Sequence, residues 1–508
     1  MCLTTIIQLL KSFINFSCRK DMFMRFSFKN GLIFFLVYGS VLNAIDLPQF
    51  YRTPFFQESF NNAYDKYTTG LSVRYGHGST HKAWDTHNDV QPLLSAHGYM
   101  DITNLGSYVD SPGAVIDSTG KTMTNYWGGA NYTPPTDAGK YDKTKETIIF
   151  PPNYIKTKPT DGLIEYMGRF EIDEWDFTIQ QDIIWGFFIQ AYIPYRDVKI
   201  DKIAYNNLGS DTLTGADVWT GGAIKAPTQV NVKDFMQEKA GTLNNVLGAM
   251  TFNSNWQDSF KKSGVGDILL SAGWHGSGDP QSPIFKRISA QAQIGVLIPT
   301  SGKPDLSKPF AVSLGSADST AIDGRINLYV QVFDFIGVGA NVGGLVFFTQ
   351  ERDLRVKTDK NQDGWILLEP SFGKVDYGSQ WDVGAYAQLG FKGIIAKVGA
   401  SYTRQEDTVL TIHDDKLLKN YSQQQLNQYD PANNVWPNVV SVNDIVNSDQ
   451  KLKNWEYYAL HFIGGYTLEL KSVCPTIFLE YDYPFYGKHA FKTDMFGGTL
   501  SVQIKLNF

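Results

Sequence analysis

The chain has 508 residues, of which 14% are aromatic and only 19% are charged, and its formal net charge is -6. Soluble domains usually carry about 25% charged residues, so this composition, with its 46 glycines, favours turns and half-buried strands over a helical enzyme. The negative charge argues against a nucleic-acid partner. The sequence contains no run of the roughly 18 apolar residues that a membrane-spanning helix needs.

The first 44 residues have the composition of an export signal. A basic stretch from Arg19 to Lys29 precedes an apolar stretch from Gly31 to Val41, and Leu42-Asn43-Ala44 is a candidate cleavage site. Residues 1–44 carry a net charge of +4, so the mature chain would carry -10. We expect a presequence over 1–44 and a periplasmic N-terminal segment over 45–66. A short membrane anchor is the alternative, but the apolar stretch is too short to span a bilayer.

Residues 67–508 show recurring two-residue alternation. A transmembrane strand needs about 9 to 11 residues, with apolar side chains facing lipid and polar ones facing the lumen. In one segment Ile294 and Val296 alternate with Gln291 and Gln293, and similar segments follow along the chain. The pattern predicts twelve strands, near residues 67–76, 161–184, 187–198, 264–275, 284–298, 323–333, 337–350, 380–389, 393–405, 455–469, 475–484 and 495–508.

The predicted connections alternate between short and long. Short turns are expected at 185–186, 276–283, 334–336, 390–392 and 471–474, with aromatic residues at several of them, and long loops lie between. Outer-membrane barrels have short periplasmic turns, long extracellular loops and aromatic girdles. Because residues 161–184 and 455–469 alternate poorly, ten or fourteen strands are alternatives.

The signal segment, the alternating strands and the final strand ending at Phe508 resemble the bacterial outer-membrane β-barrel family, which includes the porins. The resemblance implies an all-β fold, a single transmembrane antiparallel β-barrel over 67–508, in the bacterial outer membrane. It also implies outer-membrane lipid and the barrel-assembly machinery as partners, with Phe508 as part of the assembly signal.

The predicted inward faces carry many polar and charged residues, and a dry interior would not tolerate them. Twelve strands leave a narrow water-filled pore, so we expect a porin-like channel for passive diffusion of small hydrophilic solutes. A plugged barrel serving as an adhesin or structural protein is the alternative. The predicted lumen residues are Arg74, Asp182, Asp267, Arg287, Gln291, Gln293, Arg325, Gln331, Asp382, Gln388, Lys397, Glu480 and Lys505.

Two motifs suggest chemistry. Asp359, Asn361, Asp363 and Gly364 match the opening of a calcium loop, but Pro370 stands where the final glutamate belongs, so a polar hairpin explains the same residues. The pairs His77-Ser79 and His275-Ser277 resemble the His and Ser spacing of barrel phospholipases. Neither pair is followed by the asparagine of that pattern. We therefore expect no enzymatic activity, and calcium as the one candidate cofactor.

Overall fold

The computed structural model describes residues 68–102, 154–155, 158–215, 218–220, 223–225, 229–236, 259–357, 363–367, 369–413, 442–470 and 472–505. The chain divides into two compact units, Met1–Val41 and Leu42–Phe508, and all described residues belong to the second. The expected presequence, the segment 45–66 and Phe508 lie outside the described residues.

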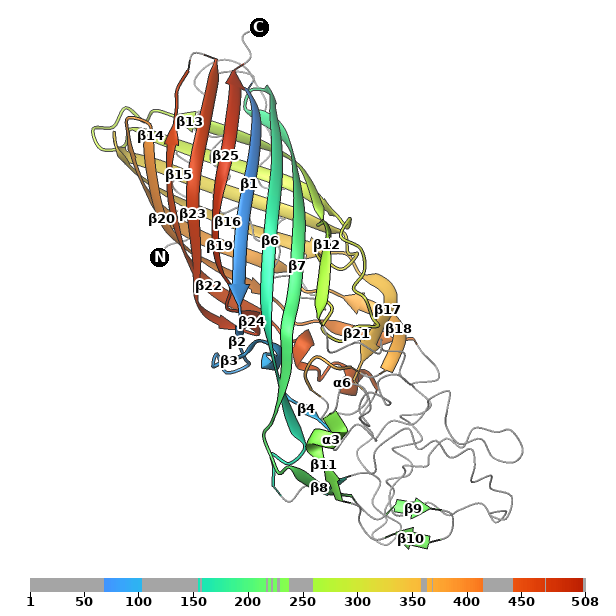
Figure 1. The fold of residues 1–508 in the computed structure, drawn as a ribbon. Coiled ribbons are helices and arrows are strands. Elements are labelled where there is room, and N and C mark those ends of the chain that lie inside the picture. The colour runs from blue at the N-terminus through green and yellow to red at the C-terminus, as the bar shows by residue number, and fades with distance from the viewer. Residues whose placement is uncertain are drawn as a thin grey trace. The chain divides into compact units, whose positions relative to one another are not determined.

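Twelve antiparallel strands form a closed barrel. The ring closes because β1 pairs with β25 on one side and with β6 on the other, and β6 pairs with β7, which continues the order β13, β14 and onward back to β25. Figure 1 shows β25, β1, β6 and β7 side by side along the wall. The fold class and the twelve predicted strands are confirmed. The strands are β1 (Thr68–Thr80), β6 (Leu163–Ile184), β7 (Phe187–Asn207), β13 (Ile268–Gly278), β14 (Arg287–Ile298), β15 (Ala321–Phe333), β16 (Ile336–Phe347), β19 (Gln380–Phe391), β20 (Ile394–Gln405), β22 (Trp455–Thr467), β23 (Val473–Lys488) and β25 (Asp494–Lys505).

Tight turns join the strands at one end of the barrel. Trp185 and Gly186 both have positive φ, as do Lys392 and Gly393, which fits the two-residue hairpin turns whose twist matches that of paired strands. A Cβ on Gly186 would lie 2.1 Å from the carbonyl oxygen of His275, so glycine is required there. The other short connections are 279–286, 334–335 and 468–472, close to the predicted positions. We call this the turn end and the opposite one the loop end.

The β6–β7 hairpin is longer than the other strand pairs of the barrel. With 22 and 21 residues, these strands exceed the 9 to 11 residues that cross a bilayer, so they continue past the barrel at the loop end. There β12 (Phe260–Val265) pairs with β7, and β4 (Met100–Asp101) pairs with β6. The hydrogen-bonded pairing of β6 and β7 with each other and with these short strands extends beyond the barrel and supports the long connections.

The long connections contain small sheets and short helices. One sheet joins β2 (Lys82–Trp84), β3 (Val90–Pro92) and β24 (Ala490–Phe491), and another joins β17 (Gln350–Val356), β18 (Glu369–Asp376) and β21 (Val409–Ile412). The remaining elements are β5 (Tyr154–Ile155), β8 (Thr212–Gly215), β9 (Val218–Thr220), β10 (Ala223–Lys225), β11 (Gln229–Asn231), α3 (Val232–Met236), α6 (Val442–Val446), η3 (Leu93–Ser95) and η7 (Gln450–Leu452). Among the described ranges, no helix is long and apolar enough to cross a membrane.

The main apolar core lies at the loop end. Inward-facing residues near the loop end of the barrel strands, such as Leu297 and Leu345, belong to one buried cluster together with residues of the long connections. We call the connection residues of this cluster the loop cap. Its main members are Leu93, Leu94, Met100, Phe310, Val312, Leu314, Trp365, Ile366, Val446 and Leu452. The described loops are therefore packed protein that covers the mouth of the barrel, joined to it by a continuous core.

Candidate functional site: the inner wall of the barrel

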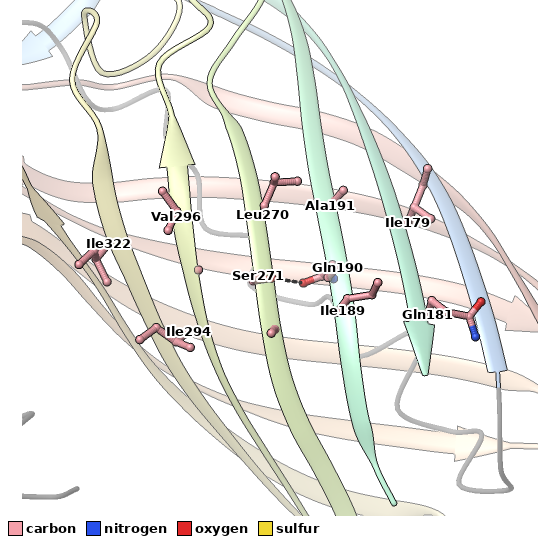
Figure 2. Close-up of a pocket in the computed structure, with 12 residues that line it drawn as sticks. Ile179, Gln181, Ile189, Gln190, Ala191, Leu270, Ser271, Ile294, Val296 and Ile322 are labelled. Carbon is pink, nitrogen blue, oxygen red and sulfur yellow. Dashed lines mark hydrogen bonds between the residues drawn. The ribbon is translucent and has the colours of Figure 1, made fainter. Parts of the chain in front are cut away.

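The outer face of the barrel is apolar and exposed. Ile294 is 54% exposed and Leu479 is 60% exposed, and similar exposed apolar side chains occur at alternate positions along the barrel strands. A groove of about 640 Å³ crosses this face from β6 to β15, and Figure 2 shows Ile189, Leu270 and Val296 among the apolar residues that line it. Soluble monomers rarely expose apolar patches above a few hundred Å². This face is suited to lipid.

The inner face is polar over the turn-end part of the barrel. Asp182 accepts hydrogen bonds from Gln180 Nε2 at 3.2 Å and from the hydroxyl of Thr68, and it lies 3.1 Å from His275 Nε2. These side chains come from β1, β6 and β13 and are buried. One small apolar cluster, Ile395 with Ile463 and Phe478, interrupts this polar surface. Buried polar groups persist only where they are hydrogen-bonded or hydrated.

Arg74 is the centre of a second cluster at mid-wall. Its Nε donates to Glu480 Oε1 at 2.8 Å and its Nη1 donates to Asp176 Oδ2 at 3.0 Å, while its Nη2 lies 3.7 Å from Asp482. Glu480 also accepts from Thr499 at 3.1 Å. One cation thus faces three carboxylates from two strands. This cluster joins β6, β1 and β23 across the place where the first barrel strand, β1, pairs with the last, β25.

Asp482 also belongs to a chain of hydrogen bonds that crosses β23, β22 and β20. His461 Nδ1 lies 2.7 Å from Asp482 Oδ1, and His461 Nε2 lies 2.8 Å from Ser401 Oγ. All three side chains are on the inner face, because each alternates with an exposed apolar neighbour such as Phe462. No sequence motif marked Ser401 or His461. They meet only through the register of β20, β22 and β23, which the sequence pattern does not give.

Charged wall residues also anchor the loop that follows β14. Arg196 pairs with Glu174 at 2.8 Å and donates to the Leu314 carbonyl oxygen at 2.6 Å. Asp267 accepts from the backbone amides of Ser301, at 3.1 Å, and Ser316. Residues 299–320 are thereby tied to the wall by charged side chains as well as by apolar packing. Asp267, predicted from sequence as a lumen residue, makes its contacts with this loop.

The other predicted lumen residues whose side chains the structure describes make separate small contacts. Gln291 donates to Gln293 at 3.2 Å, Arg325 pairs with Asp323 at 3.0 Å, and Asp382 accepts from Asn341 at 3.2 Å. Lys397 Nζ lies 5.4 Å from the centre of the Tyr386 ring. Gln331 donates to the Asp334 carbonyl oxygen at 3.0 Å, and Arg287 is its cross-strand partner. Gln388 pairs in register with Gly337 and Lys397, and the Lys505 side chain lies outside the described residues.

The motifs that suggested chemistry are separated from one another. Asp359 and Asn361 lie outside the described residues, and Asp363 pairs with Lys357 at 3.2 Å. Within the described ranges, no group of three or more His, Cys, Asp or Glu side chains is placed to hold a metal ion. His77 contacts Asp173 at 3.0 Å on the exposed face, whereas His275 faces inward to Asp182.

The loop cap holds a buried histidine. The His97 ring packs edge-on against Trp365, with 5.4 Å between ring centres, and lies 5.8 Å from the ring of His489. Burial lowers the pKa of His97 well below its usual value of 6.5, and the charges of His489 and Lys451 lower it further. Burial also lowers the pKa of His489. Both rings are therefore neutral in the packed cap at neutral pH.

A closed antiparallel barrel with an apolar outer face and a polar inner face defines the chain as an outer-membrane β-barrel protein. No protein-family model and no curated protein matches it. Solved structures of several outer-membrane channels are similar, among them the following three. An outer-membrane channel from Pseudomonas putida F1 is 7% identical and covers 86% of this chain and 94% of its own, with a TM-score of 0.38. The P. putida toluene transporter TodX is 7% identical, with 91% and 96% covered and a TM-score of 0.33. The NanC porin is 8% identical, with 66% and 94% covered and a TM-score of 0.25. No residue correspondence follows from scores this low.

Proposed function

We propose that the barrel is a channel that lets small hydrophilic solutes diffuse passively through the outer membrane. The observation that supports this is the polar inner wall. Several different barrel strands contribute to it, with Arg74, Asp182, His275 and their partners. Charged groups inside a barrel are stable where they are paired or hydrated, and a hydrated lumen accommodates those of this wall. A water-filled lumen of twelve strands is wide enough for small solutes and too narrow for large ones.

The paired charges argue for weak ion selectivity. Arg74 is surrounded by three carboxylates, while Lys397 and Arg325 place cations elsewhere on the wall. Because both signs line the lumen, an ion of either sign finds an attractive group. The loop cap, and not the charge of the wall, would then set the rate of passage, since it covers the mouth with packed apolar side chains.

The channel proposal is tested by planar-bilayer recording of refolded protein, together with swelling of vesicles in sugars of increasing size. We expect small conductance steps, and swelling with monosaccharides that is lost for larger sugars. A matched variant that lacks residues 303–313 should keep the barrel and raise the conductance, because the removed segment carries Phe310 and Val312 of the cap. Silent bilayers and unswollen vesicles for both proteins would contradict a channel.

A plugged barrel with a structural or adhesive role is the second candidate. The loop cap favours it, because an apolar core joins several long connections at the mouth. This candidate predicts no conductance in the wild type but conductance after loop removal. In either case the partners we propose are outer-membrane lipid along the apolar face and the barrel-assembly machinery, which would read a C-terminal signal that includes Phe508. Calcium binding by Asp359, Asn361 and Asp363 remains a proposal.

A further inference from the structure

We propose that Ser401, His461 and Asp482 form a nucleophilic triad, and that the barrel hydrolyses carboxylic esters inside its lumen. The inference goes beyond a channel function. It requires water and a small ester to reach the inner wall, but it does not require passage through the barrel.

The hydrogen-bond geometry fixes the role of each group. The Asp482 carboxylate can only accept, so the proton between it and His461 is on Nδ1, at an Nδ1 to Oδ1 distance of 2.7 Å. In the neutral ring this leaves Nε2 as an acceptor, and Ser401 Oγ lies 2.8 Å from it. The serine hydroxyl therefore donates to a histidine whose opposite nitrogen is held by a carboxylate. This is the arrangement that activates a serine nucleophile.

Three paired barrel strands hold the triad in place. Ser401, His461 and Asp482 come from β20, β22 and β23, which are consecutive neighbours in the ring. His461 and Asp482 are direct cross-strand partners. Side chains on paired strands have little freedom to separate, because the ladder fixes their backbones. Asp482 is further held in place by Arg74, whose Nη2 lies 3.7 Å from its Oδ2.

Small residues lie opposite the serine and the histidine on the neighbouring strands, and both side chains are buried, each 8% exposed. The residues opposite Ser401 are Gly384 on β19 and Ala459 on β22. Neither has a side chain larger than a methyl group. The residue opposite His461 on β20 is Gly399, which has no side chain. An acyl group could lie over these small residues while its carbonyl carbon approaches Ser401.

The reaction that this geometry supports is acyl transfer to serine. Ser401 Oγ would form a bond to the carbonyl carbon as its proton passes to His461 Nε2. The bond from that carbon to the alcohol oxygen would then break, and the alcohol would leave with the proton from Nε2. Water would next attack the acyl-serine and give a proton to His461, and the carboxylic acid would depart as Oγ regains the proton. The substrate class is a water-soluble ester small enough to enter a narrow polar lumen.

Covalent labelling tests the proposal. Wild-type protein folded in detergent is treated with diisopropyl fluorophosphate, and the modified residue is identified by peptide mass spectrometry. We expect one adduct, on Ser401. Ser401→Ala should abolish it, and His461→Gln should slow labelling by about 10²-fold or more, the range for loss of a general base. Ser271→Ala is the matched control, because Ser271 is an equally buried inner-wall serine whose partner, Gln190, is not a base.

Asp482 is a positioning residue and needs a different readout. Asp482→Asn should slow labelling and change its pH–rate profile, because the histidine tautomer and its basicity both change, while Asp482→Glu should restore part of the rate. Heat-modifiable migration on gels shows that each variant has folded. An unmodified Ser401 in folded wild type, or labelling that is unaffected by His461→Gln, would overturn the triad. Neither result would alter the bilayer conductance, so the triad and the channel fail separately.

Discussion

The two ends of the inner wall differ although the same strands form both. Near the turn end the inward positions are Gln293, Asp182 and His275, whereas near the loop end they are Leu297, Leu345 and Phe347. On β14 this change takes only four residues. The outer face stays apolar along the whole length. The outer face is therefore apolar at both ends, as a bilayer requires, while the inner face differs between them: paired polar and charged side chains line one end, and packed loops cover the other.

The largest effect should come from the loop cap. Phe310 is fully buried, with its ring centre 5.4 Å from Tyr166 and 6.4 Å from Trp365. Phe310→Ala should lower the free energy of opening the cap by about 3 to 5 kcal/mol, the usual cost of deleting a buried ring. Limited proteolysis would detect this as rapid cleavage within 299–320 of a barrel that stays heat-modifiable. Phe333→Ala, at the exposed turn end, is the control, and equal sensitivity of both variants would contradict a cap with its own core.

A smaller effect should separate the two faces of one strand. Leu328 is 37% exposed on the outer face, and Asn327 next to it faces inward. Leu328→Arg should destabilise the folded barrel by about 2 to 4 kcal/mol if the site is near the bilayer midplane. Asn327→Arg adds the same charge to the polar lumen and should cost much less. Urea titration of refolding into vesicles compares the two, and a reversed order would exchange the assigned faces.

At mid-wall, the Arg74 cluster should control ion preference. Arg74→Met removes the cation and leaves Asp176, Glu480 and Asp482 facing the lumen. The reversal potential in a salt gradient should shift toward cation selectivity, because the remaining local charge is negative. Lys392→Met removes a cation from a turn outside the lumen and should leave the potential unchanged. Identical potentials for the two variants would place the Arg74 cluster away from the ion path.

The smallest effect should be the pH dependence of the cap. The pKa of His97 is below 6.5 when buried, so the packed cap binds fewer protons than the opened cap once the pH falls below 6.5. The cap should therefore weaken as the pH drops, by up to about 1.4 kcal/mol per pH unit until His97 itself titrates. Hydrogen exchange of residues 93–102 at pH 7 and pH 5 measures this. His97→Phe should remove much of the dependence, and the rest would come from His489.

The sequence predicted the barrel well and its loop end poorly. Two-residue alternation is a local signal, so it located all twelve strands, including 161–184 and 455–469, where alternation is weak. The cap depends on contacts such as that of Phe310 with Trp365, which are far apart in the chain and follow no period. The Ser401, His461 and Asp482 chain was missed for the same reason: its members are 60 and 21 residues apart and meet only through strand register.

The most direct test of a water-filled lumen beneath an apolar cap is thiol accessibility on β14 in a background in which Cys2, Cys18 and Cys474 are replaced by serine. Gln293→Cys, Ile294→Cys and Leu297→Cys place the probe on the polar inner wall, the lipid face and the capped inner wall, where the native side chains are 7%, 54% and 1% exposed. A charged, membrane-impermeant thiol reagent applied to folded protein in vesicles should react quickly at position 293 and slowly at 294 and 297. Fast reaction at 294 with protection at 293 would contradict the account, and equal protection at 293 and 297 would mean that water does not fill the lumen.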